Sequence, residues 1–125
     1  MSTRPLEIVI VDDEKQITEL IKMAVLFASQ HSNIHTFTDP EEAHVYLEKN
    51  KVDILITDYK MPKYNGLQLM EGVSPLVKKV LISGYVSEIA EEKLAKLNAT
   101  FFEKPVPMKA LGRIISEQEK IVSAK

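Results

Sequence analysis

The regular alternation of short apolar runs with longer amphipathic stretches is the feature that most constrains the fold of this chain. Residues 6–11 (LEIVIV) are largely β-branched and nearly uncharged, which predicts a buried strand. From Glu14 the apolar residues change to helical spacing, which indicates an amphipathic helix. The residues predicted to line the inner face of that helix are Ile17, Leu20, Ile21, Ala24, Val25 and Ala28.

The same alternation repeats along the rest of the chain. Further strands are predicted at residues 34–38, 52–57, 79–82 and 100–103. Further helices are predicted at about 40–50, 66–73, 87–97 and 107–122. Strands that alternate with helices favour right-handed βαβ units and a parallel sheet covered on both faces. We therefore predict a doubly wound α/β fold with a five-stranded parallel sheet and five flanking helices.

Length and composition restrict the class of protein. A chain of 125 residues predicts one domain over 1–125, with its core at about 6–122. The net charge of −2 argues against direct binding to nucleic acid or to anionic membranes. The absence of Cys excludes disulfides, thiolate zinc sites and cysteine catalysis. The apolar run near the start is too short for a signal peptide or a membrane span, so we expect a cytoplasmic protein.

Charged and polar residues follow the predicted strands at the points where those strands end. Asp12 and Asp13 follow the first strand, and Asp58 follows the third. Ser83 follows the fourth strand and Lys104 the fifth. In a doubly wound sheet, ligands bind beyond the carboxyl ends of the strands. We therefore expect three carboxylates, a hydroxyl and an ammonium to converge at one edge of the sheet.

Three carboxylates at one edge would repel one another unless a cation lay between them. A few carboxylates together with water and a phosphate oxygen are the usual ligands of Mg²⁺ in proteins. With the charge neutralised, one Asp can attack a phosphorus atom and become an acyl phosphate. Lys104 and Ser83 can help to neutralise the equatorial oxygens of the transferred group. The constellation therefore indicates phosphoryl transfer.

The chain resembles the receiver domains of two-component response regulators over nearly its whole length. The matching segments are VDDE at 11–14, DYKMPKYNG at 58–66, ISGY at 82–85 and FFEKP at 101–105. Each segment on its own is common, but all four in this order, each after its predicted strand, are a specific signal. The resemblance implies a flavodoxin-like sheet with the strand order 2-1-3-4-5.

The resemblance also implies a role for each matching residue. Asp58 would be the phosphoacceptor, and Asp12 and Asp13 would hold Mg²⁺ directly or through water. The backbone carbonyl of Lys60 would be a further metal ligand, and Lys104 would contact the phosphoryl oxygens. The peptide bond between Lys104 and the following proline is often cis in this family.

A conformational switch is implied as well. Ser83 would bind the phosphoryl group, and Phe101 matches the aromatic residue whose rotamer follows that serine. The face formed by the fourth helix, the fifth strand and the fifth helix would then shift between two states. The phosphoryl group would come from a sensor histidine kinase or a phosphotransfer protein, and the domain would turn over no external metabolite.

The resemblance leaves the output partner open. The chain ends a few residues after the last predicted helix, so we expect a stand-alone regulator or a receiver that is part of a longer protein. An unidentified output domain or partner protein would read the switch. The resemblance also suggests a homodimer through the fourth and fifth helices.

Three departures from the family pattern lead to further expectations. The segment between residues 66 and 83 is shorter than is usual and contains Gly72 and Pro75, so the third helix should be truncated. Phe101 lacks the hydroxyl of the more common Tyr. Lys60 and Tyr85 would flank the path of an attacking water, and we hypothesise that they slow hydrolysis of the acyl phosphate.

Simpler interpretations stay open at this point. Asp12 and Asp13 could cap the first helix, and Phe101 could be an ordinary core residue. An aspartyl phosphohydrolase is disfavoured because Lys60 stands where its second, proton-donating Asp would be. A nucleotide or flavin site would need a glycine-rich turn after the first strand. A receiver-like module that works without phosphorylation is the remaining alternative.

The three histidines lack metal-binding spacing and are predicted to lie at the surface without acidic partners.

Overall fold

The computed structural model describes residues 4–84 and 91–123. The strands are β1 (Leu6–Val11), β2 (Ser32–Phe37), β3 (Ile54–Asp58), β4 (Lys78–Ser83) and β5 (Ala99–Glu103). The helices are α1 (Lys15–Ala28), α2 (Pro40–Lys49), α3 (Gly66–Glu71), α4 (Glu91–Lys96) and α5 (Met108–Ser123). The predicted order of elements is confirmed, and the strand boundaries differ from the predicted ones by at most two residues.

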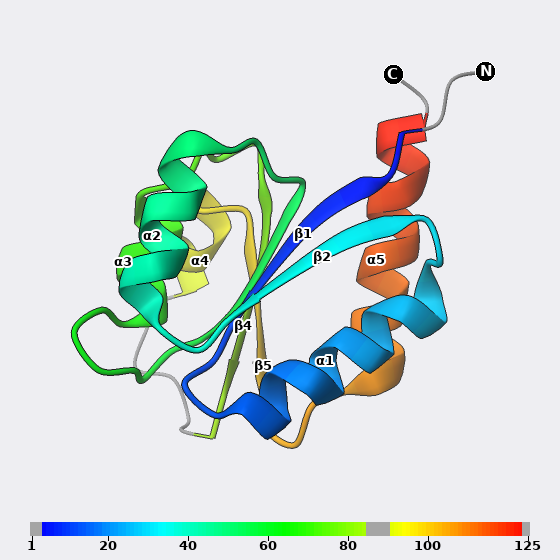
Figure 1. Cartoon of the computed structure of the whole chain (residues 1–125). Coiled ribbons are helices and arrows are strands. Elements are labelled where there is room, and N and C mark those ends of the chain that lie inside the picture. Colours follow the sequence, from blue (N-terminus) through cyan, green and yellow to red (C-terminus); the bar gives the residue numbers. More distant parts are fainter. Residues whose placement is uncertain (1–3, 85–90, 124–125) are drawn as a thin grey trace.

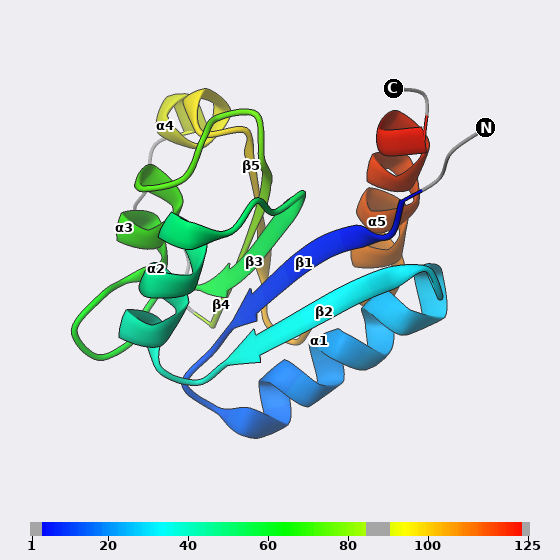
Figure 2. The same cartoon turned by 45° about the horizontal axis from the view of Figure 1, so that its top comes forward.

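Within the described residues, the strands form one parallel sheet with the order β2-β1-β3-β4-β5. This is the predicted doubly wound, flavodoxin-like order. Helices α1 and α5 lie side by side on one face of the sheet, and α2, α3 and α4 cover the other face (Figures 1 and 2). Because all strands run in the same direction, their carboxyl ends meet at one edge of the sheet. No helix in the described part of the chain is long and apolar enough to span a bilayer.

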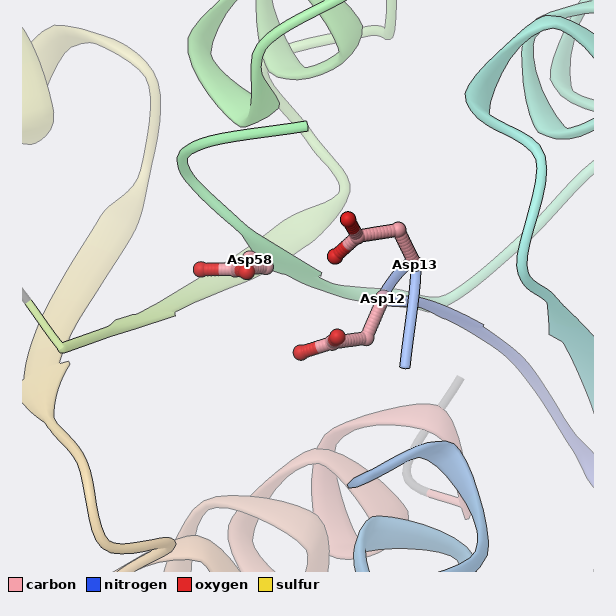
Figure 3. A group of neighbouring side chains, drawn as sticks. All are labelled: Asp12, Asp13 and Asp58. Atoms are coloured by element: carbon pink, nitrogen blue, oxygen red, sulfur yellow. The ribbon is translucent and has the colours of Figure 1, made fainter. Parts of the chain in front are cut away.

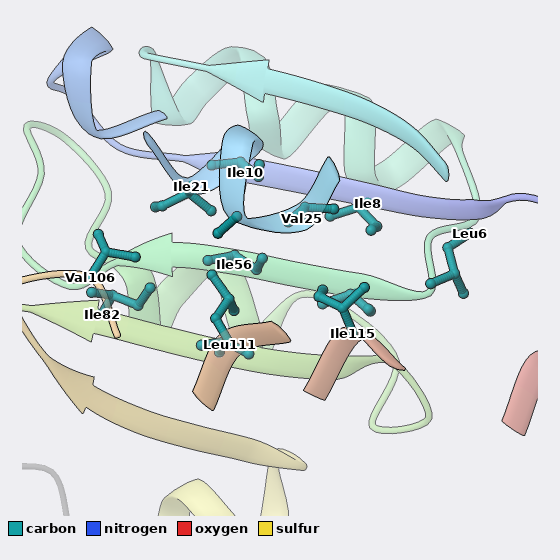
Figure 4. Close-up of a cluster of buried hydrophobic side chains, with 13 residues drawn as sticks. Leu6, Ile8, Ile10, Ile21, Val25, Ile56, Ile82, Val106, Leu111 and Ile115 are labelled. Atoms are coloured by element: carbon teal, nitrogen blue, oxygen red, sulfur yellow. The ribbon is translucent and has the colours of Figure 1, made fainter. Parts of the chain in front are cut away.

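The core consists of two clusters, one on each face of the sheet, because side chains alternate along the central strands. On β1, Ile8 and Ile10 face α1 and α5, whereas Val9 and Val11 face the other three helices. Figure 4 shows the first cluster packed between the sheet and the α1 and α5 helices. Each fully buried Ile or Leu stabilises the fold by about 1.5–3 kcal/mol. The run of β-branched residues in β1 therefore forms the centre of the fold.

One residue of the predicted inner face of α1 points elsewhere. Ile21, Ala24 and Val25 are buried against the sheet and α5, as expected. Leu20, however, is 38% exposed, so its assignment to the inner face is wrong. Successive residues are rotated by about 100° around a helix, and the sheet covers a narrower arc of α1 than the apolar residues occupy. The exposed apolar surface of α1 therefore does not contribute to the core.

The shortening of the third helix is confirmed. Helix α3 has 6 residues and ends at Glu71, with Gly72 as its C-cap. Its N-terminus is fixed by Asn65, whose side chain accepts a hydrogen bond from Gln68 N while the Gln68 side chain accepts one from Asn65 N. The fourth helix was predicted at 87–97. Helix α4 is described from Glu91, and residues 87–90 lie outside the described part of the chain.

Lys79 has a role that the sequence pattern did not indicate. It is fully buried in β4, and its ammonium donates hydrogen bonds to the carbonyl oxygens of Ser74, Val77 and Leu97 at 2.8–2.9 Å. These three acceptors lie before β4 and after α4. Burial lowers the pKa of Lys79 to about 8. The side chain therefore ties the start of β4 to the end of α4.

His35 and His44 have acidic neighbours, so the prediction that the histidines lack such partners is wrong. His35 Nε2 lies 3.2 Å from Glu7 Oε1 on the adjacent strand. His44 Nε2 lies 3.3 Å from Glu48 Oε1, one turn along α2. The first pair crosses between paired strands, which the spacing of residues along the sequence does not reveal.

Candidate functional site

Three aspartate side chains converge where β1 and β3 end. Asp12 and Asp58 are 1% and 8% exposed, whereas Asp13 faces solvent. One carboxylate oxygen from each residue lies within 4.8 Å of those from the other two. In Figure 3 the carboxyl groups of Asp12 and Asp13 point from their backbone toward the side on which Asp58 lies. The predicted convergence of carboxylates is therefore observed.

Lys104, just beyond β5, joins this group. Its Nζ lies 3.1 Å from Asp12 Oδ2 and 3.4 Å from Asp58 Oδ2. The following peptide bond, Lys104–Pro105, is cis. Strand β5 pairs in parallel with β4, which in turn pairs in parallel with β3. The end of β5 therefore lies at the same edge of the sheet as the carboxylates, within reach of the ammonium. The predicted meeting of an ammonium with the acidic residues is thus observed.

The electrostatics of the group are unbalanced. Burial raises the pKa of Asp58 above its ordinary value, although Lys104 works in the opposite direction. Burial also raises the pKa of Asp12, and repulsion from Asp58 adds to this effect. Burial by itself would lower the pKa of Lys104, but its hydrogen bond to Asp12 and the nearby carboxylates raise it. Three carboxylates against this ammonium leave two formal negative charges in a partly buried site.

The donor set fits a hard divalent cation. The three aspartates offer oxygen ligands, which Mg²⁺ prefers, and their separation lets one small ion contact all three directly or through water. A divalent charge would balance the two uncompensated negative charges. The exposure of Asp13 leaves an approach for the ion and for waters that complete its coordination.

Backbone contacts hold the two buried carboxylates in place. Glu14 N donates to Asp12 Oδ1 at 2.9 Å, and Tyr59 N donates to Asp58 Oδ1 at 2.8 Å. Both donors lie in the turns that follow the strands, so the local course of the chain orients each carboxyl group. Asp12 therefore has the hydrogen bond of a turn residue, but its contact with Lys104 is not explained by a capping role.

Gly66 has a structural reason to be glycine. A Cβ atom on this residue would lie 2.1 Å from the backbone carbonyl oxygen of Asp58. Gly66 N also donates to the carbonyl of Tyr59 at 2.7 Å. The loop after β3 therefore closes back onto the residue that begins it. Gly66 lies in one of the segments that match the family, but only the structure shows that it supports Asp58.

Two further predicted site residues, Ser83 and Phe101, lie on β4 and β5. Ser83 is buried at the end of β4, and its carbonyl accepts a hydrogen bond from Lys104 N at 2.8 Å. Phe101 pairs in register with Leu81 and is partly buried against the second core cluster. Its environment is that of a core aromatic at the edge of the sheet, and its role as a switch stays a prediction.

A pocket of about 590 Å³ opens over the carboxylates. Its described lining residues are Asp13, Glu14, Asp58, Lys60, Met61, Pro62, Gly84 and Lys104. The side chain of Lys60 is exposed at this pocket, and its role near the acceptor stays a prediction. Glu14 and Gly84 also lie in the segments that follow the predicted strands, but no role in the site was predicted for either. Tyr85 lies outside the described residues.

Comparison with known proteins identifies the family. The model of the response regulator receiver domain matches residues 8–116. Two curated relatives match over 77 residues, or 61% of this chain. They are an uncharacterized response regulatory protein of Staphylococcus epidermidis, 32% identical, and the transcriptional regulatory protein HptR of Staphylococcus aureus, 34% identical. The matched segment is 31% of the length of each relative.

Solved structures show the same fold. A CheY-like receiver domain protein from Methanospirillum hungatei has a TM-score of 0.81 at 23% identity, covering 96% of this chain and 98% of that one. The receiver domain of a DNA-binding response regulator from Colwellia psychrerythraea also has a TM-score of 0.81, at 19% identity, covering 92% of this chain and 98% of that one. At these identities the likeness establishes the architecture alone.

Proposed function

The chain belongs to the response regulator receiver domain family of two-component signalling, and we propose that it accepts a phosphoryl group on Asp58 in a Mg²⁺-dependent reaction. The observation that supports this most strongly is the meeting of three carboxylates with Lys104. The Nζ of Lys104 is 3.4 Å from Asp58 Oδ2, and oxygens of Asp12 and Asp13 lie within 4.8 Å of one from Asp58.

The proposed step is an in-line displacement at phosphorus. An oxygen of ionised Asp58 forms the new O–P bond while the P–N bond of a phosphohistidine breaks. The imidazole nitrogen leaves with the electron pair and takes up a proton. Lys104 assists by favouring the ionised form of Asp58 and by facing the oxygens that carry the developing negative charge. The open pocket above Asp58 provides the approach for the donor.

Asp12, Asp13 and Asp58, together with the backbone carbonyl of Lys60, would hold the metal ion. When bound, Mg²⁺ would neutralise negative charge on the carboxylates and on the phosphoryl oxygens. The fixed orientation of Asp12 and Asp58 by neighbouring backbone N–H groups supports this assignment, because it limits the reorganisation that binding requires.

Phosphorylation replaces the single negative charge of ionised Asp58 with a group that carries about 1.5–2 negative charges at pH 7 and three acceptor oxygens. Ser83 and Lys104 would be drawn toward the new group, and Phe101 would follow. The hydrogen bond from Lys104 N to Ser83 O supports coupled movement of the β4 and β5 ends. We propose that the α4-β5-α5 face shifts its population between two conformations as a result.

The proposed partners follow from this role. A sensor histidine kinase or a phosphotransfer protein would supply the phosphoryl group, and an output domain or partner protein would read the switched face. The protein would act in the cytoplasm and would bind neither membranes nor nucleic acid directly. Hydrolysis at Asp58 would reset the domain, with Lys60 and Tyr85 slowing the approach of water. A homodimer through α4 and α5 is a further prediction.

Intact mass after incubation with a small phosphodonor tests the central assignment. We expect one added phosphoryl group that requires Mg²⁺, is lost with EDTA, and is absent in Asp58→Asn. Asp53→Asn serves as the matched control, since it makes the same chemical change in a carboxylate that pairs with Arg4 and does not line the pocket. A folded wild-type protein that gains no phosphoryl group with Mg²⁺ would instead favour the phosphorylation-independent module.

A further inference from the structure

The segment of residues 59–65, which we call the acceptor loop, joins β3 to α3 and forms part of the proposed site. Lys60, Met61 and Pro62 of this loop line the pocket over Asp58. The backbone carbonyl of Lys60 is also a proposed ligand of Mg²⁺. The conformation of the acceptor loop therefore determines the shape of one wall of the pocket.

Hydrogen bonds close the base of the acceptor loop, but its middle has an unusual backbone conformation. At the base, Gly66 N donates to the carbonyl of Tyr59 at 2.7 Å, and Asn65 caps the N-terminus of α3. Lys63 has a φ of 70°, in the left-handed region that residues with a side chain rarely adopt. Such a conformation persists where the surrounding structure holds it. Helix α3, with 6 residues, is a short support for this loop.

A second support comes from α2, which lies beside the acceptor loop (Figures 1 and 2). The ring of Tyr64 stacks on that of His44, with the centroids 5.2 Å apart and 22° between the planes. One residue earlier in the loop, Lys63 Nζ lies 2.9 Å from Glu41 Oε1. Glu41 and His44 are three residues apart on α2 and therefore share one side of that helix. The two contacts together hold the loop against α2.

His44 makes the more important of these contacts. The side chains of Lys63 and Glu41 are both more than half exposed, and ion pairs between such groups contribute little. A stacked pair of rings contributes more. The ring of His44 is also close to the other end of α3, because a Cβ atom on Gly72 would lie 3.9 Å from His44 Cε1. His44 therefore lies beside both the acceptor loop and the C-cap of the short helix that follows it.

We propose that His44 is a positioning residue for phosphoryl transfer at Asp58. By stacking on Tyr64, it holds the acceptor loop against α2 and so maintains the wall of the pocket that includes Lys60. This role rests on the proposed function, because it acts through a loop that carries a proposed metal ligand. His44 is not among the described residues that line the pocket, so it acts on the site through the loop.

Loss of the stack should shift the acceptor loop toward open conformations. The contribution of an aromatic pair corresponds to about two- to tenfold in an equilibrium constant. The ratio of open to closed loops should rise by this factor. Because only the closed loop would present the Lys60 carbonyl to the metal ion, the apparent Kd for Mg²⁺ should rise as the closed fraction falls.

Proteolysis by trypsin in EDTA tests the contact without metal or phosphodonor. Trypsin cleaves after lysine, and cleavage after Lys60 or Lys63 should follow the population of the open loop. We expect this cleavage to be about two- to tenfold faster in His44→Ala. Cleavage after Lys51, in the segment that follows α2, should not change. The comparison with Lys51 distinguishes release of the loop from fraying of α2.

Two further variants separate the ring from its other contacts. His44→Phe keeps a ring that can stack on Tyr64 and should be cleaved at nearly the wild-type rate. Glu48→Gln changes the carboxylate whose Oε1 lies 3.3 Å from His44 Nε2, but it leaves the imidazole in place. We expect Glu48→Gln to behave as the wild type does in cleavage, metal affinity and labelling.

Mg²⁺ titration by calorimetry and labelling by a small phosphodonor then test the role in the site. In His44→Ala, we expect the Kd for Mg²⁺ to rise about twofold or more and the initial rate of labelling to fall. His44→Phe should restore both values. Urea unfolding of the same variants provides the comparison with global stability. A positioning role requires that metal affinity and labelling follow the presence of a ring at position 44 and not the free energy of unfolding.

Several outcomes would overturn the proposal. Wild-type cleavage, metal affinity and labelling in His44→Ala would do so and would leave the phosphoacceptor assignment intact. Equal losses in His44→Ala and His44→Phe would show that the stack is not the cause. Faster cleavage with unchanged metal affinity and labelling would limit His44 to supporting the loop. A folded wild type that is not labelled with Mg²⁺ would remove the proposed function together with this role.

Discussion

The Nζ atom of Lys104 lies 3.4 Å from Oδ2 of Asp58, although the two residues are 46 positions apart in the chain. The same ammonium is 3.1 Å from Asp12 Oδ2, so one cation serves two buried carboxylates. This arrangement gives Lys104 two separable effects. It favours the ionised form of Asp58, the proposed nucleophile, and its positive charge weakens the attraction of the carboxylates for a metal ion.

Replacing Lys104 should separate phosphorylation from metal binding. In Lys104→Met, we expect the rate of labelling by a small phosphodonor to fall about 10²-fold, in line with the loss of one preorganised charge at a developing anion. Mg²⁺ affinity should be unchanged or higher, because a competing positive charge is gone. Labelling by intact mass and Mg²⁺ titration by calorimetry measure the two effects. A parallel loss of both would show that Lys104 only maintains the structure.

Removing the charge of Asp58 should stabilise the metal-free protein. The raised pKa of Asp58 means that its ionised form is disfavoured in the folded state relative to the unfolded chain. We expect Asp58→Asn to increase the free energy of unfolding by about 1 kcal/mol in EDTA. At 100 times its Kd, Mg²⁺ should stabilise the wild type by about 2.7 kcal/mol and the variant by much less. Urea unfolding with and without Mg²⁺ measures both.

Asp53→Asn is a matched control for that experiment, since it makes the same chemical change with the opposite expected sign. Asp53 accepts two hydrogen bonds from the Arg4 guanidinium, at 2.7 and 2.8 Å, and one from Glu7 N at 2.8 Å. Its charge is therefore well solvated by donors, and the variant should be less stable than the wild type. Stabilisation of both variants would indicate a general effect of net charge.

A methyl group on Gly66 should disturb the site from the backbone side. Because its Cβ would lie 2.1 Å from the carbonyl oxygen of Asp58, the loop or β3 must shift. We expect Gly66→Ala to lower the free energy of unfolding by about 1–3 kcal/mol and to slow phosphorylation. In Gly72→Ala the nearest atom would be 3.6 Å away, so this control should be close to neutral. Equal stabilities of the two variants would contradict the close approach at Gly66.

The features that the sequence could predict are those carried by local pattern. The β-branched runs and helical spacing identify the order of elements, and the strand ends indicate that Asp12, Asp58 and Lys104 meet. The exact packing was harder to predict from the sequence. An apolar residue such as Leu20 has the spacing of a core residue, yet it lies outside the part of α1 that packs against the sheet. Strand pairing sets the neighbours of His35, and no local pattern records it.

Long-range coordination by backbone carbonyls was equally hidden. In the sequence Lys79 is only a charged residue at the start of a predicted strand. Its hydrogen-bond acceptors include carbonyl oxygens five residues before it and 18 residues after it. A hollow between α1 and α5, lined by Ala24, Ala28, Gly112 and Ser116 among others, depends on small residues of two helices that are far apart in sequence. Neither feature has a periodicity that a single segment could show.

Lys79 should make the stability of the fold depend on alkaline pH. Its pKa is about 8 in the folded state against 10.5 for an unperturbed lysine, so between these values the unfolded chain binds more protons. The free energy of unfolding should therefore rise with pH across this window, by about 3 kcal/mol for a shift of this size. Below pH 8 Lys79 stays charged in the folded protein. Its three hydrogen bonds to carbonyl oxygens partly offset the free-energy cost of burying that charge. Lys79→Met should lose the rise, whereas Lys51→Met, at an exposed position, should keep it. Urea unfolding at pH 7, 8, 9 and 10 measures the slope, and equal slopes in wild type and Lys79→Met would show that Lys79 titrates as an ordinary lysine.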